Sequence, residues 1–269
     1  MDSGSSPHPE IIAGVRDPER AGERISIPDV RITRFDFEDP GTFSSALQGI
    51  DRFFLVRPPA ISNVRKYIRP VIEQAVVSDV SHIVFLSLQG VEENPVVPHH
   101  RIEQYIVESG ISHTFLRPSF FMQNLSTTHR EEIRERGELF IPAGSRRFNF
   151  IDVRDIGEAA ALVLSHPGGH ENRKYELTGT RNYDFFEITR ILSEVLQRTI
   201  EYMDPSALGF LRRKRQEGYP VMHITVMILL YRAGQNGGEP RITDTIGQLL
   251  GRDPISFQTF AEDYRHRWE

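Results

Sequence analysis

The sequence predicts an α/β protein in which a mostly parallel sheet, covered by helices on both faces, is followed by a smaller mixed lobe. Short apolar runs alternate with segments of helical spacing through the first half of the chain, and this alternation is typical of βαβ units. The chain has 269 residues, of which 39% are hydrophobic and 26% charged, so it is large enough to fold around its own core.

The first half of the chain supplies the expected parallel sheet. Short runs rich in β-branched or aromatic residues predict strands. They are 11–15, 31–35, 52–56, 82–88 and 113–118. Helical spacing predicts the helices between them, at 41–48, 62–77 and 98–109. Pro98 suits a first helical turn and Gly110 suits a C-cap, so the last of these helices is delimited at both ends.

The pattern changes after about residue 120, where short strands and longer helices alternate. The expected strands are 138–141 and 174–177, and the expected helices are 152–165, 183–197, 205–215, 219–232 and 255–267. We therefore expect a flexible tail at 1–10 and one domain over 11–269. Its two lobes, 11–150 and 151–269, are expected to enclose a cleft.

Composition excludes several classes of protein. Without cysteine, the chain has no disulfide, thiolate nucleophile, iron–sulfur cluster or zinc ribbon, and a net charge of −5 gives no reason to expect a nucleic-acid partner. The longest apolar stretch, Val221–Tyr231, is shorter than the ~20 residues of a membrane span. The N-terminus also lacks the pattern of a signal peptide, so we expect a cytoplasmic protein.

Seven stretches of the sequence stand in the order found in one known family. They are VRDPER (15–20), FDFEDPGTFSSALQGID (35–51), FFLVRPP (53–59), HHRIEQYIVESGISHTFLRPSFFMQNL (99–125), FIDVRDIGEAAALVL (150–164), YELTGTRNYDFFEITRILSEVLQR (175–198) and GRDPISFQTFAEDY (251–264). On these stretches the chain resembles the NmrA-like atypical short-chain dehydrogenase/reductases. The resemblance implies a Rossmann-like, NAD(P)-binding sheet with a nucleotide lobe (11–150) and a substrate lobe (151–269).

The chain departs from the family at its start. Family members begin with a strand and a GxxGxxG turn that cradles the cofactor pyrophosphate, but only ten residues precede Ile11 here. A strand and its crossover need more residues than that, so the expected sheet lacks its first βα unit. Either the chain is truncated relative to its gene product, or it has lost the cradle. The sheet edge left open would be covered by the N-terminal tail or a partner, and a homodimer is one hypothesis.

Three residues match the family's positions around the adenosine half of the cofactor. Arg16 follows the first strand, where an arginine accommodates a 2′-phosphate; this favours NADP(H) over NAD(H). Asp36 and Phe37 match the adenine-side positions. The alternatives are a solvated loop arginine, an aspartate that caps a turn, and a core phenylalanine. Without the glycine-rich turn, it also remains open that no cofactor binds.

Further candidates follow the next two strands. Val56, Arg57 and Pro58 match the family's loop beside the ribose, although a proline-rich turn explains them equally well. Ser87 and Gln89 end the following strand at the same edge of the sheet. No tyrosine is followed four residues later by lysine, so the Tyr–Lys acid of ordinary short-chain dehydrogenases is absent.

His99 and Glu103 are the candidate catalytic residues of the next helix, together with Ser87. Residues four apart share a helix face, so Glu103 could orient His99, which would contact the nicotinamide ribose or act as an acid. His100 takes this place if the helix begins one residue later, and two solvent-facing histidines are the alternative. No metal site is expected, since the sequence has no HExxH motif.

Phe120, Phe121 and Asn124 resemble the family's pocket wall beneath the nicotinamide, which suits a planar acceptor, although core packing also explains the two rings. Asp152 and Asp155 are interpreted as caps of the helix that follows them. The basic run Arg212–Arg215 is interpreted as a solvated helix face or a partner contact.

Two functions follow from these residues. The first is an NAD(P)H-dependent reductase that transfers hydride directly to a small planar acceptor such as a quinone. The second is a non-catalytic nucleotide-sensing or partner-binding regulatory protein that has lost the pyrophosphate-binding loop.

Overall fold

A computed structural model describes residues 9–25, 27–233 and 239–269, and the chain divides into two compact units. Unit 1 comprises Met1–Arg117 and Ala160–Tyr175, and unit 2 comprises Pro118–Ala159 and Glu176–Glu269. The chain passes between the units three times, whereas the sequence predicted a single division near residue 150. Most of the predicted N-terminal tail lies outside the described residues.

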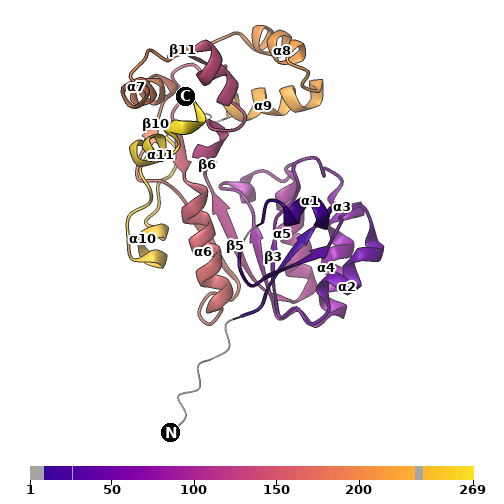
Figure 1. The fold of residues 1–269 in the computed structure, drawn as a ribbon. Coiled ribbons are helices and arrows are strands. Elements are labelled where there is room, and N and C mark those ends of the chain that lie inside the picture. Colours follow the sequence, from indigo (N-terminus) through magenta and orange to yellow (C-terminus); the bar gives the residue numbers. More distant parts are fainter. Residues whose placement is uncertain (1–8, 26, 234–238) are drawn as a thin grey trace. The chain divides into compact units, whose positions relative to one another are not determined.

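Unit 1 contains a sheet of four strands in the order β3-β4-β5-β9 (Figure 1). The strands are β3 (Arg52–Leu55), β4 (His82–Leu86), β5 (Ser112–Pro118) and β9 (Arg173–Leu177). The helices of this part are α2 (Phe43–Leu47), α3 (Val64–Tyr67), α4 (Arg69–Val77), α5 (Pro98–Ser109) and the end of α6 (Val153–Ser165). The first three strands pair in parallel, and four of the five residues of β4 are buried, as expected for a central parallel strand. The predicted α/β fold is confirmed.

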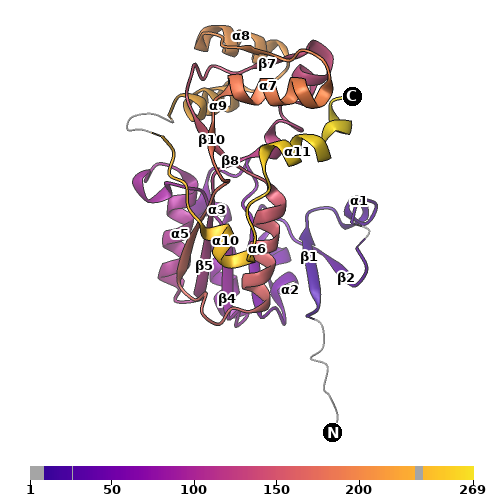
Figure 2. The same ribbon diagram turned by 90° about the vertical axis from the view of Figure 1, so that its left-hand side faces the viewer.

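A second, two-stranded sheet of unit 1 stands apart from the first (Figure 2). It pairs β1 (Ile11–Val15) in parallel with β2 (Val30–Arg34), and α1 (Pro18–Gly22) connects them. In the doubly wound strand order 3-2-1-4-5-6, the first strand joins the second to the fourth. The sequence printed here has no such unit, which accounts for the separation of β1 from β3. As a result, no residue of β1 is buried.

Unit 2 packs short strands and helices around an aromatic core. Its strands are β6 (Phe120–Phe121), β7 (Glu138–Phe140), β8 (Phe148–Ile151), β10 (Asn182–Tyr183) and β11 (Glu201–Met203). Its helices are α7 (Phe185–Leu196), α8 (Ala207–Gln216), α9 (Val221–Ala233), α10 (Thr245–Leu250) and α11 (Phe257–Asp263), with the start of α6. The core includes the rings of Phe148, Phe185 and Phe257. α7 begins with a capping box between Asp184 and Glu187, which satisfies backbone donors at that end.

Two predicted helices are shorter than expected. The segment 62–77 is divided into α3 and α4, because Pro70 lies in the first turn of α4 and cannot continue the hydrogen bonding of α3. The segment 255–267 ends its α-helix at Asp263 and continues as a 3-10 turn over Arg265–Arg267. None of the helices in the described ranges is long and apolar enough to cross a membrane.

Candidate functional site

Several candidate residues of unit 1 lie after the carboxyl ends of β3 and β4, where open parallel sheets bind ligands. Arg57 lies in the loop after β3, and Ser87 and Gln89 lie in the loop after β4. α5 begins at Pro98 as predicted, so His99 lies in its first turn.

Arg57 stabilises the loop that carries it. Its Nη1 donates hydrogen bonds to the carbonyl oxygens of Pro58, Pro59 and Ile61, at 2.9, 3.2 and 2.6 Å. Burial lowers the pKa of its guanidinium. Its Nε is buried and has no hydrogen-bond partner in the part of the chain that the structure describes. One donor of Arg57 is therefore left for a ligand.

The side chain of His99, like that of Arg57, has a buried nitrogen atom without a hydrogen-bond partner among the described residues. Its ring stacks on that of Phe85, with centroids 5.9 Å apart. Burial, and then the charge of Arg57, lowers the pKa of His99 to about 4. Its Nδ1 is buried and makes no hydrogen bond to any described residue. At neutral pH His99 is therefore suited to hydrogen bonding with a ligand rather than to acting as a cationic acid.

His100 has other contacts. Its Nδ1 lies 3.0 Å from the carbonyl oxygen of Val91 and its Nε2 lies 3.1 Å from Nε2 of Gln104. Both ring nitrogens are thus engaged, and His100 serves as a matched comparison for His99.

Glu103 contacts Ser87 and Arg117. Its Oε1 accepts hydrogen bonds from Ser87 Oγ at 2.6 Å and Arg117 Nε at 3.0 Å, and its Oε2 accepts one from Arg117 Nη2 at 2.6 Å. All three residues are buried, and Arg117 also pairs with Glu92 at 2.8 Å. No hydrogen bond joins Glu103 to His99, so the expectation that Glu103 orients His99 is wrong. Arg117 was not among the candidates, although it lies in the matching stretch LRP.

The predicted adenosine-side residues take two different environments. Arg16 is exposed, and no hydrogen bond or ion pair joins it to a described residue. Asp36 shapes its own turn, since its Oδ1 accepts from the Glu38 amide at 3.0 Å. Phe37 packs edge-on against Phe35, with centroids 4.9 Å apart. Asp36 and Phe37 therefore have the contacts of the structural alternatives, whereas Arg16 keeps its hydrogen-bonding groups available.

Phe120, Phe121 and Asn124 belong to unit 2. All three are partly exposed, and the ring of Phe120 contacts those of Phe148 and Tyr231, with centroids 5.3 and 6.1 Å apart. Phe120 therefore combines core packing with an accessible ring.

In the same unit, Asp152 and Asp155 are buried against Arg154 and Arg252. Asp152 also accepts from the Arg154 amide at 2.9 Å, as expected of a cap.

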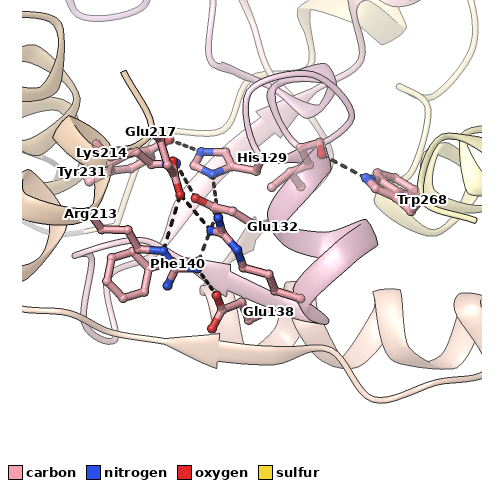
Figure 3. A network of polar contacts seen from close by, with 11 residues as sticks. His129, Glu132, Glu138, Phe140, Arg213, Lys214, Glu217, Tyr231 and Trp268 are labelled. Atoms are coloured by element: carbon pink, nitrogen blue, oxygen red, sulfur yellow. Dashed lines mark hydrogen bonds and ion pairs between the residues drawn. The ribbon is translucent and has the colours of Figure 1, made fainter. Parts of the chain in front are cut away.

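A buried polar network in unit 2 was missed by sequence reasoning (Figure 3). Lys214 is 1% exposed and its Nζ pairs with Glu132 and, at 2.8 Å, with Glu217. Glu132 Oε2 lies 2.9 Å from Nδ1 of His129, whose Nε2 lies 2.7 Å from the Tyr231 hydroxyl. Burial raises the pKa of Glu132, but His129 and Lys214 outweigh this and lower it to about 2.

This network corrects the interpretation of the basic run. Lys214 is not on a solvated face, and Arg213 is largely buried against Glu138. No pattern of spacing could reveal these pairs, because 82 positions separate Lys214 from Glu132.

Across residues 9–25, 27–233 and 239–269, no group of three or more His, Cys, Asp or Glu side chains could hold a metal ion.

Comparisons with known proteins identify relatives over most of the chain. The model of the NmrA-like family matches residues 7–240. The chain is 31% identical over 252 residues to an NAD(P)H azoreductase of Xenophilus azovorans, covering 92% of this chain and 87% of that protein. It is 29% identical over 253 residues to Prestalk A differentiation protein A of Dictyostelium discoideum, covering 94% and 83%. The NADPH complex of an Escherichia coli quinone oxidoreductase has the same fold, with a TM-score of 0.84 at 24% identity over 98% of this chain and 93% of that one.

Proposed function

Because the chain belongs to the NmrA-like family, we propose that it is an NAD(P)H-dependent reductase that acts on a small planar acceptor such as a quinone. The observation that carries the proposal is that two neighbouring candidate residues of unit 1 each have a buried polar atom without a hydrogen-bond partner among the described residues, Arg57 Nε and His99 Nδ1. The Nε atoms of Arg52, Arg146 and Arg147 share this property elsewhere in the described ranges. Buried polar atoms without partners are rare in proteins, and a bound polar ligand would satisfy those of Arg57 and His99. The relative at 31% identity is a reductase that uses NAD(P)H.

The residues present fit two parts of a nicotinamide dinucleotide. The hydroxyl groups of a ribose can donate to or accept from His99 and can accept from Arg57. Arg16 offers an unengaged guanidinium for a 2′-phosphate, which favours NADP(H). For the pyrophosphate, the printed sequence does not contain the GxxGxxG turn that usually binds it.

The residues of the chain would bind and orient the reactants. The reduced nicotinamide supplies the hydride when it is bound. The Ser87 hydroxyl donates a hydrogen bond to Glu103, which leaves the lone pairs of the Ser87 oxygen as acceptors of fixed direction. Arg117 holds Glu103 in place through both carboxylate oxygens. Neutral His99 contributes a hydrogen bond from unit 1. Within unit 2, the rings of Phe120 and Phe121 are partly exposed, and such rings suit contact with flat molecules.

Steady-state reduction of a soluble quinone, followed by loss of NADPH absorbance, tests this function. We expect turnover by the original chain and a fall of about tenfold or more for His99→Ala, the loss of one ligand hydrogen bond in a buried site. His100→Ala is the matched control and should change turnover less than twofold, because its hydrogen bonds are made within the chain. Absence of turnover with quinone and azo acceptors alike would reject the reductase function.

A non-catalytic nucleotide-sensing or partner-binding protein is the second candidate. The relatives favour it, because they include a differentiation protein besides reductases. A homodimer that covers the open edge of β1 belongs to this proposal as well as to the first. Saturable binding of NADPH without turnover of any acceptor would support the second candidate.

A further inference from the structure

Unit 2 has a groove lined by arginines on the exposed side of α8. Gly209, Arg212, Arg213 and Gln216 line it from one helix face, at the spacing i, i+3, i+4 and i+7. Arg136 and Glu217 complete the lining, and the volume is about 470 Å³. We propose that this groove binds an oxyanion of the phosphate class, either free or as a phosphomonoester.

Two of the three guanidinium groups are held in place before any ligand arrives. Arg213 stacks on the ring of Phe140 at 4.2 Å and pairs with Glu138 (Figure 3). Its Nε also lies 3.5 Å from Glu217, which accepts a hydrogen bond from Arg136 Nη1 at 2.8 Å. No hydrogen bond occupies Arg213 Nη1 or Arg136 Nη2 among the described residues. Donors fixed in this way lose little conformational freedom when they bind an oxyanion.

Arg212 supplies the charge that no carboxylate balances. It is exposed, and in the described ranges it makes no hydrogen bond or ion pair. Arg136 and Arg213 contact Glu217, and Arg213 also pairs with Glu138. Lys214 contacts Glu217 from the buried side and is itself paired with Glu132, so the unbalanced positive charge of the groove is that of Arg212. This local excess lies in a chain whose net charge is −5. A planar guanidinium matches two oxygens of a phosphate at once.

Gly209 shapes the floor of the groove. It lies one turn before Arg212 and Arg213 and has no side chain, so a ligand can approach the helix backbone closely there. A Cβ at Gly209 would lie 3.3 Å from Ser206 Oγ and 3.7 Å from the Pro205 side chain. An alanine therefore requires a small shift of the Ser206 hydroxyl, which caps α8, and it adds a methyl group at the groove without removing a charge.

Titration calorimetry with inorganic phosphate, on the full chain at constant ionic strength, tests the proposal. We expect saturable binding, weakened about threefold to fivefold by Arg212→Gln, the effect of losing a partly solvated charge pair. Arg212 has no partner to lose, so this variant should fold normally. Arg215→Gln, on the same helix but outside the lining, is the matched control and should change the affinity less than twofold. Gly209→Ala should also weaken binding.

Three results would overturn the proposal. The first is the absence of saturable binding up to about 50 mM phosphate, because weaker binding would not distinguish a specific site from nonspecific association. The second is an equal effect of Arg212→Gln and Arg215→Gln, which would indicate only general attraction by positive charge. The third is a loss of binding in Arg16→Gln with full binding in Arg212→Gln, which would assign the phosphate to unit 1. If the groove prefers an ester, phenyl phosphate should bind more tightly than inorganic phosphate, and Arg212→Gln should weaken both.

Discussion

Replacement of Lys214 by methionine should strongly destabilise unit 2, because Lys214 is a buried partner of two carboxylates. Methionine keeps most of the side-chain packing but removes the ammonium group between Glu132 and Glu217. Glu217 keeps Arg136 at 2.8 Å, whereas Glu132, 3% exposed, loses its ammonium partner and keeps the contact with His129. Leaving one buried charge without its partner costs about 3–5 kcal/mol, so we expect the free energy of unfolding to fall by that amount.

The single tryptophan makes the assay specific for unit 2. Trp268 is 1% exposed in the core of this unit, and its Nε1 donates to the carbonyl oxygen of Leu125 at 3.0 Å (Figure 3). Urea unfolding followed by tryptophan fluorescence therefore reports on the same core as Lys214. The paired variant Glu132→Gln removes the second charge but retains a hydrogen-bonding side chain toward His129 and the Phe140 amide.

The double variant decides whether the ion pair is the cause. With Lys214→Met and Glu132→Gln combined, no charge of the pair remains buried, and stability should return to within about 2 kcal/mol of the original chain. The pH dependence provides an independent check. The pKa of Glu132 is about 2 instead of 4.5, so its ionised carboxylate stabilises the folded state above pH 4.5. This contribution to the free energy of unfolding is lost as the pH falls toward 2. In Lys214→Met that pKa should rise and the loss should begin at higher pH. Additive effects of the two substitutions would refute this reasoning.

Four further predictions concern both units. Arg16→Ala should weaken NADPH binding by about tenfold or more and leave NADH binding unchanged, as measured by calorimetry; equal losses for the two cofactors would remove Arg16 from the 2′-phosphate. His99, whose pKa is about 4 instead of 6.5, should remain neutral in an NMR titration down to about pH 5, and its burial should cost stability as the pH falls from 6.5 toward 4; protonation near pH 6.5 would contradict its neutral role. Glu103→Gln should lower the melting temperature and slow quinone turnover, because Arg117 would lose a buried carboxylate; an unchanged melting temperature would show that the pair is dispensable. Gly179→Ala should destabilise unit 2 by about 2–3 kcal/mol in the fluorescence assay, since a Cβ there would overlap the carbonyl oxygen of Phe150; normal stability would mean that this backbone shifts easily.

The parallel part of the fold could be predicted because its signals are local. The apolar run at 82–88 becomes the buried strand β4, and the helix from Pro98 to the C-cap at Gly110 forms with the predicted ends. Both depend on a few consecutive residues and on glycine and proline chemistry. In unit 2 the signal is weaker, because β8 and β10 are four and two residues long. Strands of that length carry almost no periodicity.

The environments of the charged residues could not be predicted. Ser87 and Glu103 were named as candidates, but Arg117, the other partner of Glu103, comes from the next strand. Lys214 looked like one charge in a basic run, and only folding brings it to Glu132. Pairs of this kind depend on tertiary distance rather than on spacing along the chain. The neutral state of His99 likewise depends on burial, and burial is a property of the folded protein.

The most direct test of the central claim is a calorimetric titration of the purified 269-residue chain with NADPH and with NADH. We expect saturable binding of NADPH at micromolar concentrations, weaker binding of NADH, and weaker NADPH binding in His99→Ala than in His100→Ala. Such a result would mean that unit 1 binds the cofactor without a GxxGxxG turn. No binding of either dinucleotide up to millimolar concentrations would contradict the reductase function for this chain.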